Sequence, residues 1–342
     1  MQINENKPPN FELFGDVTKN SYGCFDLDNT FEAFKTVNNY LFIVYSTKSR
    51  SIICYDLLNF CIIIEIKNCH NAFITNIRHF LDKRNRRDLL ISISDRDNNL
   101  KLWNINNCEC ILEIIHANNN GFLCSACLLN ENDNIYIISS NCNMHGETEK
   151  IKIFDLEGKI INQINDSNEK TYFLESFYDK INKKVYLITG NFNYIKSYDY
   201  KENNLYKKYF DNESGIHISI KILEENDMIS LIESCSYGFI RIWNFHSGVL
   251  INKIKVDNDW IFGICLWDKD YAFVACKYKI IKLVNLKEGI IERNLEGHNS
   301  GIFTIKKITH PEFGECLLSQ GFEEDQIKLW INQDKINEFN KK

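Results

Sequence analysis

The segment LKLWN at residues 100–104 recurs in related form seven times along the 342-residue chain. Most copies place an apolar residue, a basic residue, a small or apolar residue, an aromatic residue and then Asp or Asn in that order. The other copies are SIICYD ending at Asp56, IKIFD ending at Asp155, IKSYD ending at Asp199, IRIWN ending at Asn244, IKLVN ending at Asn285 and IKLWI ending at Ile331. The aromatic position falls at Tyr55, Trp103, Phe154, Tyr198, Trp243, Val284 and Trp330, at spacings of 41 to 51 residues. This period fits a propeller blade of four short strands, repeated seven times.

Short blocks of alternating apolar and polar residues surround these segments, such as YLFIVYS from Tyr40 and KVYLITG from Lys184. A period of two residues predicts β-strands, and no long helical periodicity competes with it. The chain is 44% hydrophobic, which is enough to fill a sizeable core and excludes disorder along most of its length. We therefore predict an all-β fold: a single seven-bladed β-propeller with four-stranded antiparallel blades.

Closure of the ring requires a strand from the N-terminal end. The first six repeats are each followed by a fourth strand, but only INQDKINEFNKK follows Trp330, and it is short and polar. We expect the segment Ser21–Leu27 to supply the missing strand of the last blade, so that no sheet edge stays open. Residues 1–20 are accordingly predicted to be a flexible tail and residues 21–342 to be the propeller.

At these residues the chain resembles the WD-repeat β-propeller family, over almost its whole length. The IKLW-type strands, Gly297-His298, the serine-rich strand with Ser92 and Ser94, and Asp97 six residues before Trp103 carry the resemblance. In that family a hydrogen-bonded tetrad of His, Ser, an acid and Trp locks the strands of a blade together. The resemblance implies one tetrad of His70, Ser92 or Ser94, Asp97 and Trp103, and a second of His298, Ser319, Glu324 or Asp325, and Trp330.

Catalytic chemistry finds little support in the sequence. Ser, His and Asp in one blade could suggest a hydrolase triad, but their spacing follows the repeat and no G-x-S-x-G segment is present. No glycine-rich phosphate loop or His/Glu metal motif occurs either. We expect no enzyme activity, no catalytic residues and no cofactor.

The 13 cysteines are an odd number, which favours reduced thiols in a reducing compartment and no disulfides. A metal site is the alternative at Cys108, Cys110, Cys124, Cys127 and Cys142. Cys124 and Cys127 have zinc-knuckle spacing, but both lie in a predicted strand, where residues three apart point to opposite faces. We therefore expect no metal.

Charge and hydropathy argue against nucleic acids as general partners and against insertion into a membrane. The net charge of −6 argues against general nucleic-acid binding, which needs a basic face. No segment approaches the length of about 18 apolar residues that a membrane span requires. The first residues, MQINENKPPN, predict no secretory leader. These features together predict a soluble protein in the cytoplasm or the nucleus.

The family resemblance implies a rigid platform for proteins or peptides, with binding centred on the narrow face around the channel. The residue before each innermost strand is expected on that face. These positions hold Phe31, Phe73, Phe122, Phe173, His217, Trp260 and Gly301. We predict that this largely aromatic ring binds a partner, with Trp260 foremost, because aromatic side chains dominate contact energies. The alternative is that some of these rings pack between blades as core.

Two other binding classes compete with a scaffold. The basic turn containing Lys83, Arg84, Arg86 and Arg87 could bind an acidic segment or a phosphoinositide, although a solvated turn explains it as well. Propellers that act as substrate receptors of ubiquitin ligases often carry Arg three residues after the repeat tryptophan, and no copy does so here. The prediction is therefore a non-catalytic scaffold or adaptor within a multiprotein assembly.

Overall fold

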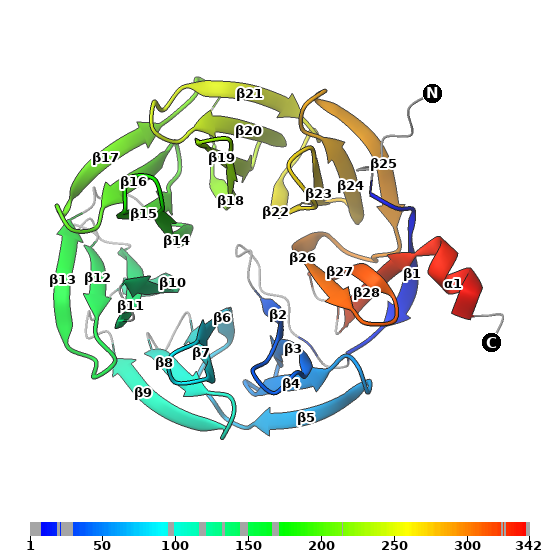
Figure 1. Ribbon diagram of the computed structural model, residues 1–342, viewed down its shortest axis with the longest axis horizontal. Helices are drawn as coiled ribbons and strands as arrows, with labels where there is room; N and C mark the ends of the chain where they lie inside the picture. Colours follow the sequence, from blue (N-terminus) through cyan, green and yellow to red (C-terminus); the bar gives the residue numbers. More distant parts are fainter. Residues whose placement is uncertain are drawn as a thin grey trace.

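Each of the seven recurrent segments forms the third strand of a four-stranded antiparallel sheet. The computed structural model describes residues 8–18, 21, 30–94, 99–115, 121–131, 134–143, 150–165, 171–213, 215–322, 324 and 326–339. Within them, seven such sheets surround a central axis as the blades of a propeller (Figure 1). The predicted fold, an all-β seven-bladed ring, is confirmed.

The four strands of each blade have distinct places in the ring. The innermost strands are β2 (Phe31–Lys35), β6 (Ile74–Asp82), β10 (Gly121–Glu131), β14 (Phe173–Asp179), β18 (His217–Glu225), β22 (Ile261–Leu266) and β26 (Ile302–His310). The second strands are β3 (Leu41–Ser46), β7 (Arg87–Ser94), β11 (Asn134–Asn143), β15 (Lys184–Gly190), β19 (Met228–Cys235), β23 (Tyr271–Cys276) and β27 (Gly314–Gly321). The third strands are β4 (Ile52–Asp56), β8 (Asn99–Asn104), β12 (Lys150–Phe154), β16 (Ile195–Asp199), β20 (Phe239–Asn244), β24 (Ile280–Asn285) and β28 (Ile327–Asn332). The outermost strands are β5 (Cys61–Ile66), β9 (Glu109–Ile115), β13 (Ile160–Asn165), β17 (Asn204–Tyr209), β21 (Leu250–Lys255), β25 (Ile290–Glu296) and β1 (Phe11–Asp16).

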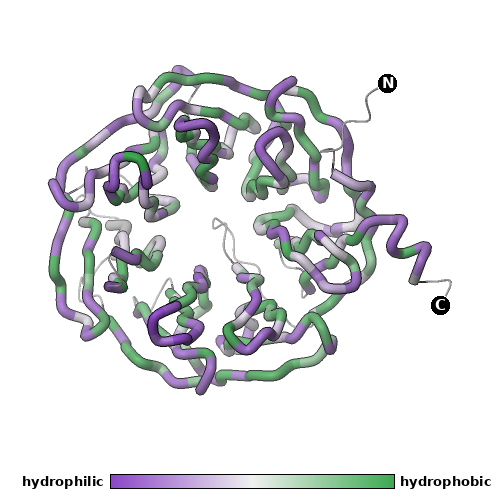
Figure 2. The backbone as a smooth tube through the Cα atoms, viewed as in Figure 1, coloured by the Kyte–Doolittle hydropathy of each residue, from purple (hydrophilic) through white to green (hydrophobic). Residues whose placement is uncertain are grey.

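Burial follows the distance of a strand from the rim. All residues of β3 and β4 are buried, because both faces of these strands pack against neighbouring blades. The outermost β5 keeps most of its side chains exposed, and Figure 2 shows mixed hydropathy along the outer circumference. Between the last and first blades, Ile43 and Tyr55 pack against Leu318 and Leu329. Burying each aliphatic side chain of this cluster contributes about 1.5–3 kcal/mol, so the blade interfaces hold the ring together.

Ring closure occurs through β1, and the predicted closing segment Ser21–Leu27 is wrong. β1 pairs antiparallel with β28 as the fourth strand of the last blade. Phe11 is buried there, with its ring 5.2 Å from that of Trp267 and 5.6 Å from that of Phe273. Leu13 pairs with Trp330 in the same sheet. Phe11 and Leu13 point to one side of the strand because they are two residues apart, and that side faces the apolar cluster of the last two blades.

The N-terminal boundary predicted at residue 20 is therefore incorrect for β1, which belongs to the propeller. Arg293 also donates hydrogen bonds to the carbonyl oxygens of Pro8 and Pro9, at 3.0 and 2.9 Å. Ser21 forms a bridge to Thr47 in the first blade, whereas residues 22–27 lie outside the described part of the chain. A short helix, α1 (Gln333–Phe339), follows β28 at the outer edge of the ring (Figure 1).

The alternation of strand direction defines two faces. We call the face on which the innermost strands begin the entry face, and the opposite one the exit face. The entry face carries the connections between blades and the turns between second and third strands, because neighbouring strands run antiparallel. β-Bulges interrupt five innermost strands at their entry-face ends, namely β6, β10, β18, β22 and β26. Bulges redirect side chains, so the first residues of these strands direct their side chains differently from the rest of the strand.

Candidate functional site

The hydrogen bonds implied for His70, Ser92 and Trp103 are present in the second blade. The distance from His70 Nε2 to Ser92 Oγ is 2.8 Å, and Trp103 Nε1 donates to the same oxygen at 2.9 Å. The serine is therefore Ser92 and not Ser94. The proposed acid, Asp97, lies outside the described residues. Ser92 is fully buried, so its hydroxyl joins strands and offers no surface nucleophile.

The last blade has the same arrangement. His298 Nε2 lies 2.6 Å from Ser319 Oγ, and Trp330 Nε1 donates to that oxygen at 2.7 Å. Glu324 Oε2 lies 2.5 Å from His298 Nδ1 and so fills the acid position, whereas Asp325 is outside the described residues. Burial acts to raise the pKa of Glu324, but the hydrogen bond and charge of His298 outweigh it and lower the pKa. The set therefore stabilises an ionised, internal carboxylate.

In the fifth blade a buried glutamate, Glu233, replaces the serine. Glu233 pairs with Arg241 in the register position where Ser92 pairs with Lys101 in the second blade. Glu233 Oε1 accepts hydrogen bonds from Trp243 Nε1 and Arg241 Nη1, both at 3.2 Å, and Oε2 contacts His217 Nδ1. The sequence does carry a signal for this cluster. Glu233 lies in the second strand of the blade, and Arg241 lies two residues before the repeat tryptophan, Trp243.

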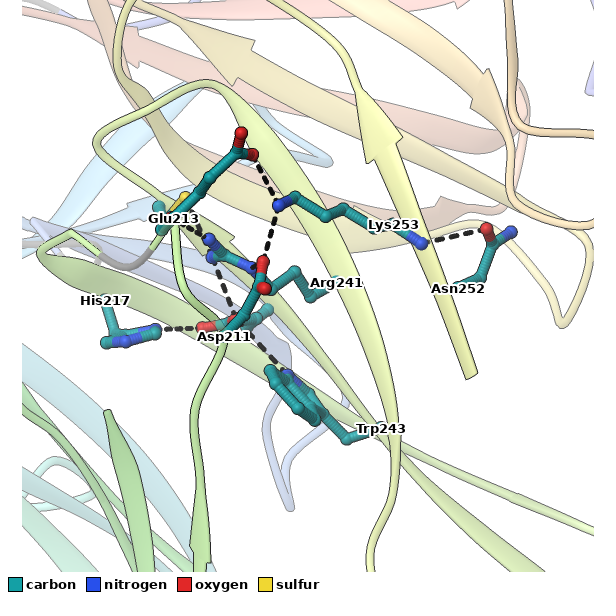
Figure 3. Close-up of polar contacts among 9 residues, drawn as sticks. Asp211, Glu213, His217, Arg241, Trp243, Asn252 and Lys253 are labelled. Atoms are coloured by element: carbon teal, nitrogen blue, oxygen red, sulfur yellow. Dashed lines mark hydrogen bonds and ion pairs between the residues drawn. The ribbon is translucent and has the colours of Figure 1, made fainter. Parts of the chain in front are cut away.

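The same cluster fixes the connection that leads into β18. Arg241, which is fully buried, contacts Asp211 Oδ2 through Nε at 3.2 Å and the carbonyl of Glu213 through Nη2. Lys253 Nζ lies 2.5 Å from the carboxylates of both Asp211 and Glu213. Figure 3 shows how Lys253 reaches between these two side chains. Burial acts to raise the pKa of Glu233, but the charges of His217 and Arg241 lower it. The cluster is thus an internal ion network that holds the entry face of this blade.

Three members of the predicted aromatic ring are buried, which corrects the expectation that they offer contact surface. Phe31 pairs with Tyr45, which occupies the strand position that Ser92 has in the second blade. Phe31 therefore lies inside the blade and not at its rim. The ring of Phe173 packs over Gly190, at the place where a β-carbon of residue 190 would sit. His217 is the first paired residue of β18, and its imidazole turns inward to Glu233. The prediction assumed that the innermost strand starts one residue later in these blades, but Phe31, Phe173 and His217 are themselves the first residues of their strands.

The rim positions that remain are Gly301, which has no side chain to offer, and the aromatic residues Phe73, Phe122 and Trp260. Phe73 is 40% exposed, and the side chain of Phe122 lies outside the described part of the structure. Trp260 is only partly exposed, because its indole packs on Phe262 with ring centroids 5.7 Å apart. It belongs to an apolar cluster contributed by the last three blades. The members of this cluster are Ile216, Ile218, Trp260, Phe262, Phe303 and Phe322.

Two exposed tyrosines flank Trp260 on the entry face. Tyr237 is 53% exposed in the turn between β19 and β20, and Tyr278 is 58% exposed in the turn between β23 and β24. We call Tyr237, Trp260 and Tyr278 the aromatic strip. Sequence reasoning missed both tyrosines because it considered only positions before innermost strands. The sequence signal that could have found them is an aromatic residue within a turn, as in Tyr237-Gly238.

Backbone and side-chain hydrogen bonds make the aromatic strip continuous. The Gly238 carbonyl accepts the amides of Val256 and Asp257, so the Tyr237 turn contacts the connection that carries Trp260. The Trp260 carbonyl accepts the Lys277 amide at 3.1 Å, and Tyr278 Oη donates to Asp259 Oδ2 at 2.8 Å. The three aromatic residues therefore stand on one hydrogen-bonded surface of the fifth and sixth blades.

The basic turn of the second blade lies on the exit face. Arg87 Nε pairs with Asp82 Oδ2 at 2.7 Å inside the turn, whereas Lys83, Arg84 and Arg86 are exposed. This segment is thus separated from the aromatic strip by the depth of the ring.

No group of three or more His, Cys, Asp or Glu side chains in the described residues could hold a metal ion. Within the same residues no cysteine forms a disulfide, and burial raises the pKa of Cys127 to about 12. Across the described ranges of the chain, no helix is long and apolar enough to cross a membrane. Neither a protein-family model nor a curated protein matches this chain.

Proposed function

We propose that this chain is a non-catalytic scaffold of the WD-repeat type that binds a protein partner through the aromatic strip. The observation that carries the proposal is the pair of tyrosines, each more than half exposed, on either side of Trp260. Exposed tyrosine and tryptophan side chains provide large contact areas at low entropic cost, and they dominate the energetics of protein interfaces. The odd number of cysteines supports a reducing compartment, the cytoplasm or the nucleus.

The rigidity of the aromatic strip supports the same function. Tyr278 is held by Asp259, and Asp259 is in turn held by Lys277 Nζ at 3.0 Å. A side chain that is already ordered loses little entropy when a partner covers it, so the free energy of contact is retained as affinity. The WD-repeat assignment rests on the seven blades and on the two Ser-His-Trp sets.

Site-specific photo-cross-linking tests this function. A benzophenone amino acid replaces Tyr278 in one variant and Tyr178 in a matched control. Tyr178 is 47% exposed at the exit-face end of β14. In an extract of the source cells, we expect a discrete protein adduct from position 278 that position 178 does not form. The same adducts from both positions, or an adduct from position 178 alone, would contradict binding through the aromatic strip.

A further inference from the structure

We propose that the partner contacts the aromatic strip through an acidic segment, whose carboxylates meet lysines beside Tyr237 and Tyr278. This inference rests on the proposed function and specifies the chemistry of the ligand. It comes from the way that charges are paired on the entry face of the fourth to sixth blades.

Most described carboxylates that border the aromatic strip already have a cationic partner; the exception is Glu296, an exposed residue whose strand position pairs with Ile280, next to the turn of Tyr278. Asp259 pairs with Lys277 at 3.0 Å, and Asp257 pairs with Lys282 at 2.9 Å. Asp211 and Glu213 share Lys253, as described above. These four acids are therefore neutralised within the protein, and among the described residues Glu296 is the one carboxylate near the aromatic strip without a cationic partner.

Three lysines on the same face have no carboxylate within 4.0 Å among the described residues. Lys255 Nζ donates to the Tyr237 carbonyl at 2.8 Å and lies 4.3 Å from the ring centroid of Phe239. Lys279 is exposed in the turn that carries Tyr278. Lys208, also exposed, lies over the Tyr194 ring at 3.3 Å in the fourth blade. These three lysines outnumber the one unpaired carboxylate, Glu296, so the unpaired charge on this face is positive, in a chain whose net charge is −6.

Separated lysines beside exposed tyrosines fit an acidic peptide better than a nucleic acid. A phosphate backbone presents a continuous row of negative charges, whereas the unpaired lysines are separated along the chain and the exposed Glu296 carboxylate stands next to the turn of Lys279. A peptide can place Asp or Glu opposite Lys255 and Lys279 and an apolar residue opposite Trp260. Complementary charges of this kind set the specificity and the association rate of an interface.

Peptide selection on the full chain tests the inference while the partner is still unidentified. A display library of random peptides of about twelve residues is selected on the wild-type protein. We expect the bound peptides to be enriched in Asp and Glu next to aromatic or aliphatic residues.

The affinity of the selected peptides should fall about tenfold in Lys255→Glu/Lys279→Glu. It should fall less in Lys279→Gln, which removes a charge without adding a repulsive one. The matched control Lys83→Glu/Arg86→Glu changes two exposed cations on the exit face and should leave binding unchanged. Melting curves confirm that the variants are folded.

The outcomes separate this inference from the function on which it rests. Peptides that lack acidic enrichment, or that bind Lys255→Glu/Lys279→Glu as tightly as the wild type, overturn the inference. If those peptides still lose affinity in Tyr278→Ala, binding through the aromatic strip stands. If no selected peptide depends on the strip or its lysines, both proposals fail. Oligo(dT) of about twelve nucleotides is measured in parallel, and tighter, lysine-dependent binding of this probe would overturn the acidic-peptide inference in favour of a nucleic acid.

Discussion

The guanidinium of Arg78 in the second blade lies 2.6 Å from the carboxylate of Glu175 in the fourth blade. The two residues belong to innermost strands, β6 and β14, that are separated by the third blade. This ion pair therefore links non-adjacent blades near the axis, in addition to the apolar contacts between neighbours. Burial acts to raise the pKa of Glu175, but the charges of Arg78 and Lys221 outweigh it and lower the pKa.

Breaking this pair should destabilise the ring. Both side chains are mostly buried, so Glu175→Gln leaves the Arg78 guanidinium without its charged partner. We expect a loss of about 1–3 kcal/mol in the free energy of unfolding, seen as a lower melting temperature. The double variant Arg78→Met/Glu175→Gln should lose less than the sum of the single variants. Strict additivity would show that the two groups do not interact in solution.

The closing strand gives a second prediction. Deleting residues 1–16 removes β1, whereas deleting residues 1–7 keeps the pairing of β1 with β28 and the contacts of Arg293. The longer deletion should lower the melting temperature sharply, and the shorter one should leave it almost unchanged. Phe11→Ala should cost about 3–5 kcal/mol, because it empties a buried aromatic site. Equal melting temperatures for the two truncations would contradict closure through β1.

The third prediction concerns the buried glutamate of the fifth blade. Glu233→Gln removes one of the two carboxylates that contact Arg241, a side chain without solvent exposure, and the other, Asp211, is shared with Lys253. Uncompensated buried charge is expensive, and we expect a loss of about 3–5 kcal/mol. Ser92→Ala, at the equivalent position of the second blade, breaks only the hydrogen bonds to His70 and Trp103 and should cost about 1–3 kcal/mol. Differential scanning fluorimetry of both variants compares them directly, and a larger loss for Ser92→Ala would refute the ion network.

His310 gives a pH-dependent prediction. It is buried, and burial lowers its pKa below the ordinary value of 6.5, although Glu312 and Asp56 act in the opposite direction. The unfolded chain therefore binds a proton more readily than the folded one, so the contribution of neutral His310 to stability is complete above pH 6.5 and is lost as the pH falls through the folded-state pKa. The melting temperature should decline on acidification below pH 6.5, and the decline should be smaller in His310→Gln. The same decline in both proteins would assign it to other groups.

The repeated third strands could be predicted because their aromatic position recurs once in each blade. That recurrence can be seen without knowing how any side chain packs. The closing strand could not, because SYGCFDL and FELFGD have similar patterns and only packing against Trp267 and Phe273 selects Phe11. The order of the strands within each blade was predicted correctly, but Phe31 and His217 were assigned to the rim because the repeat pattern carries no information on where each innermost strand starts. The exposure of Tyr237 and Tyr278 depends on how two turns fold, which periodicity does not record.

The last prediction separates the binding and packing roles within the aromatic strip. Tyr278→Ala removes a side chain that is mostly in solvent, so stability should stay nearly unchanged while partner capture weakens by about 2 kcal/mol, as for an interface hot spot. Trp260→Ala should weaken capture as well, but it should also lower the melting temperature, because its indole packs on Phe262. Tyr278→Phe is the matched control: it keeps the ring and loses only the hydrogen bond to Asp259, so most of the affinity should remain. Capture by Tyr278→Ala at wild-type strength, with the loss confined to Trp260→Ala, would place the contact on the apolar cluster near the axis and not on the turn of the sixth blade.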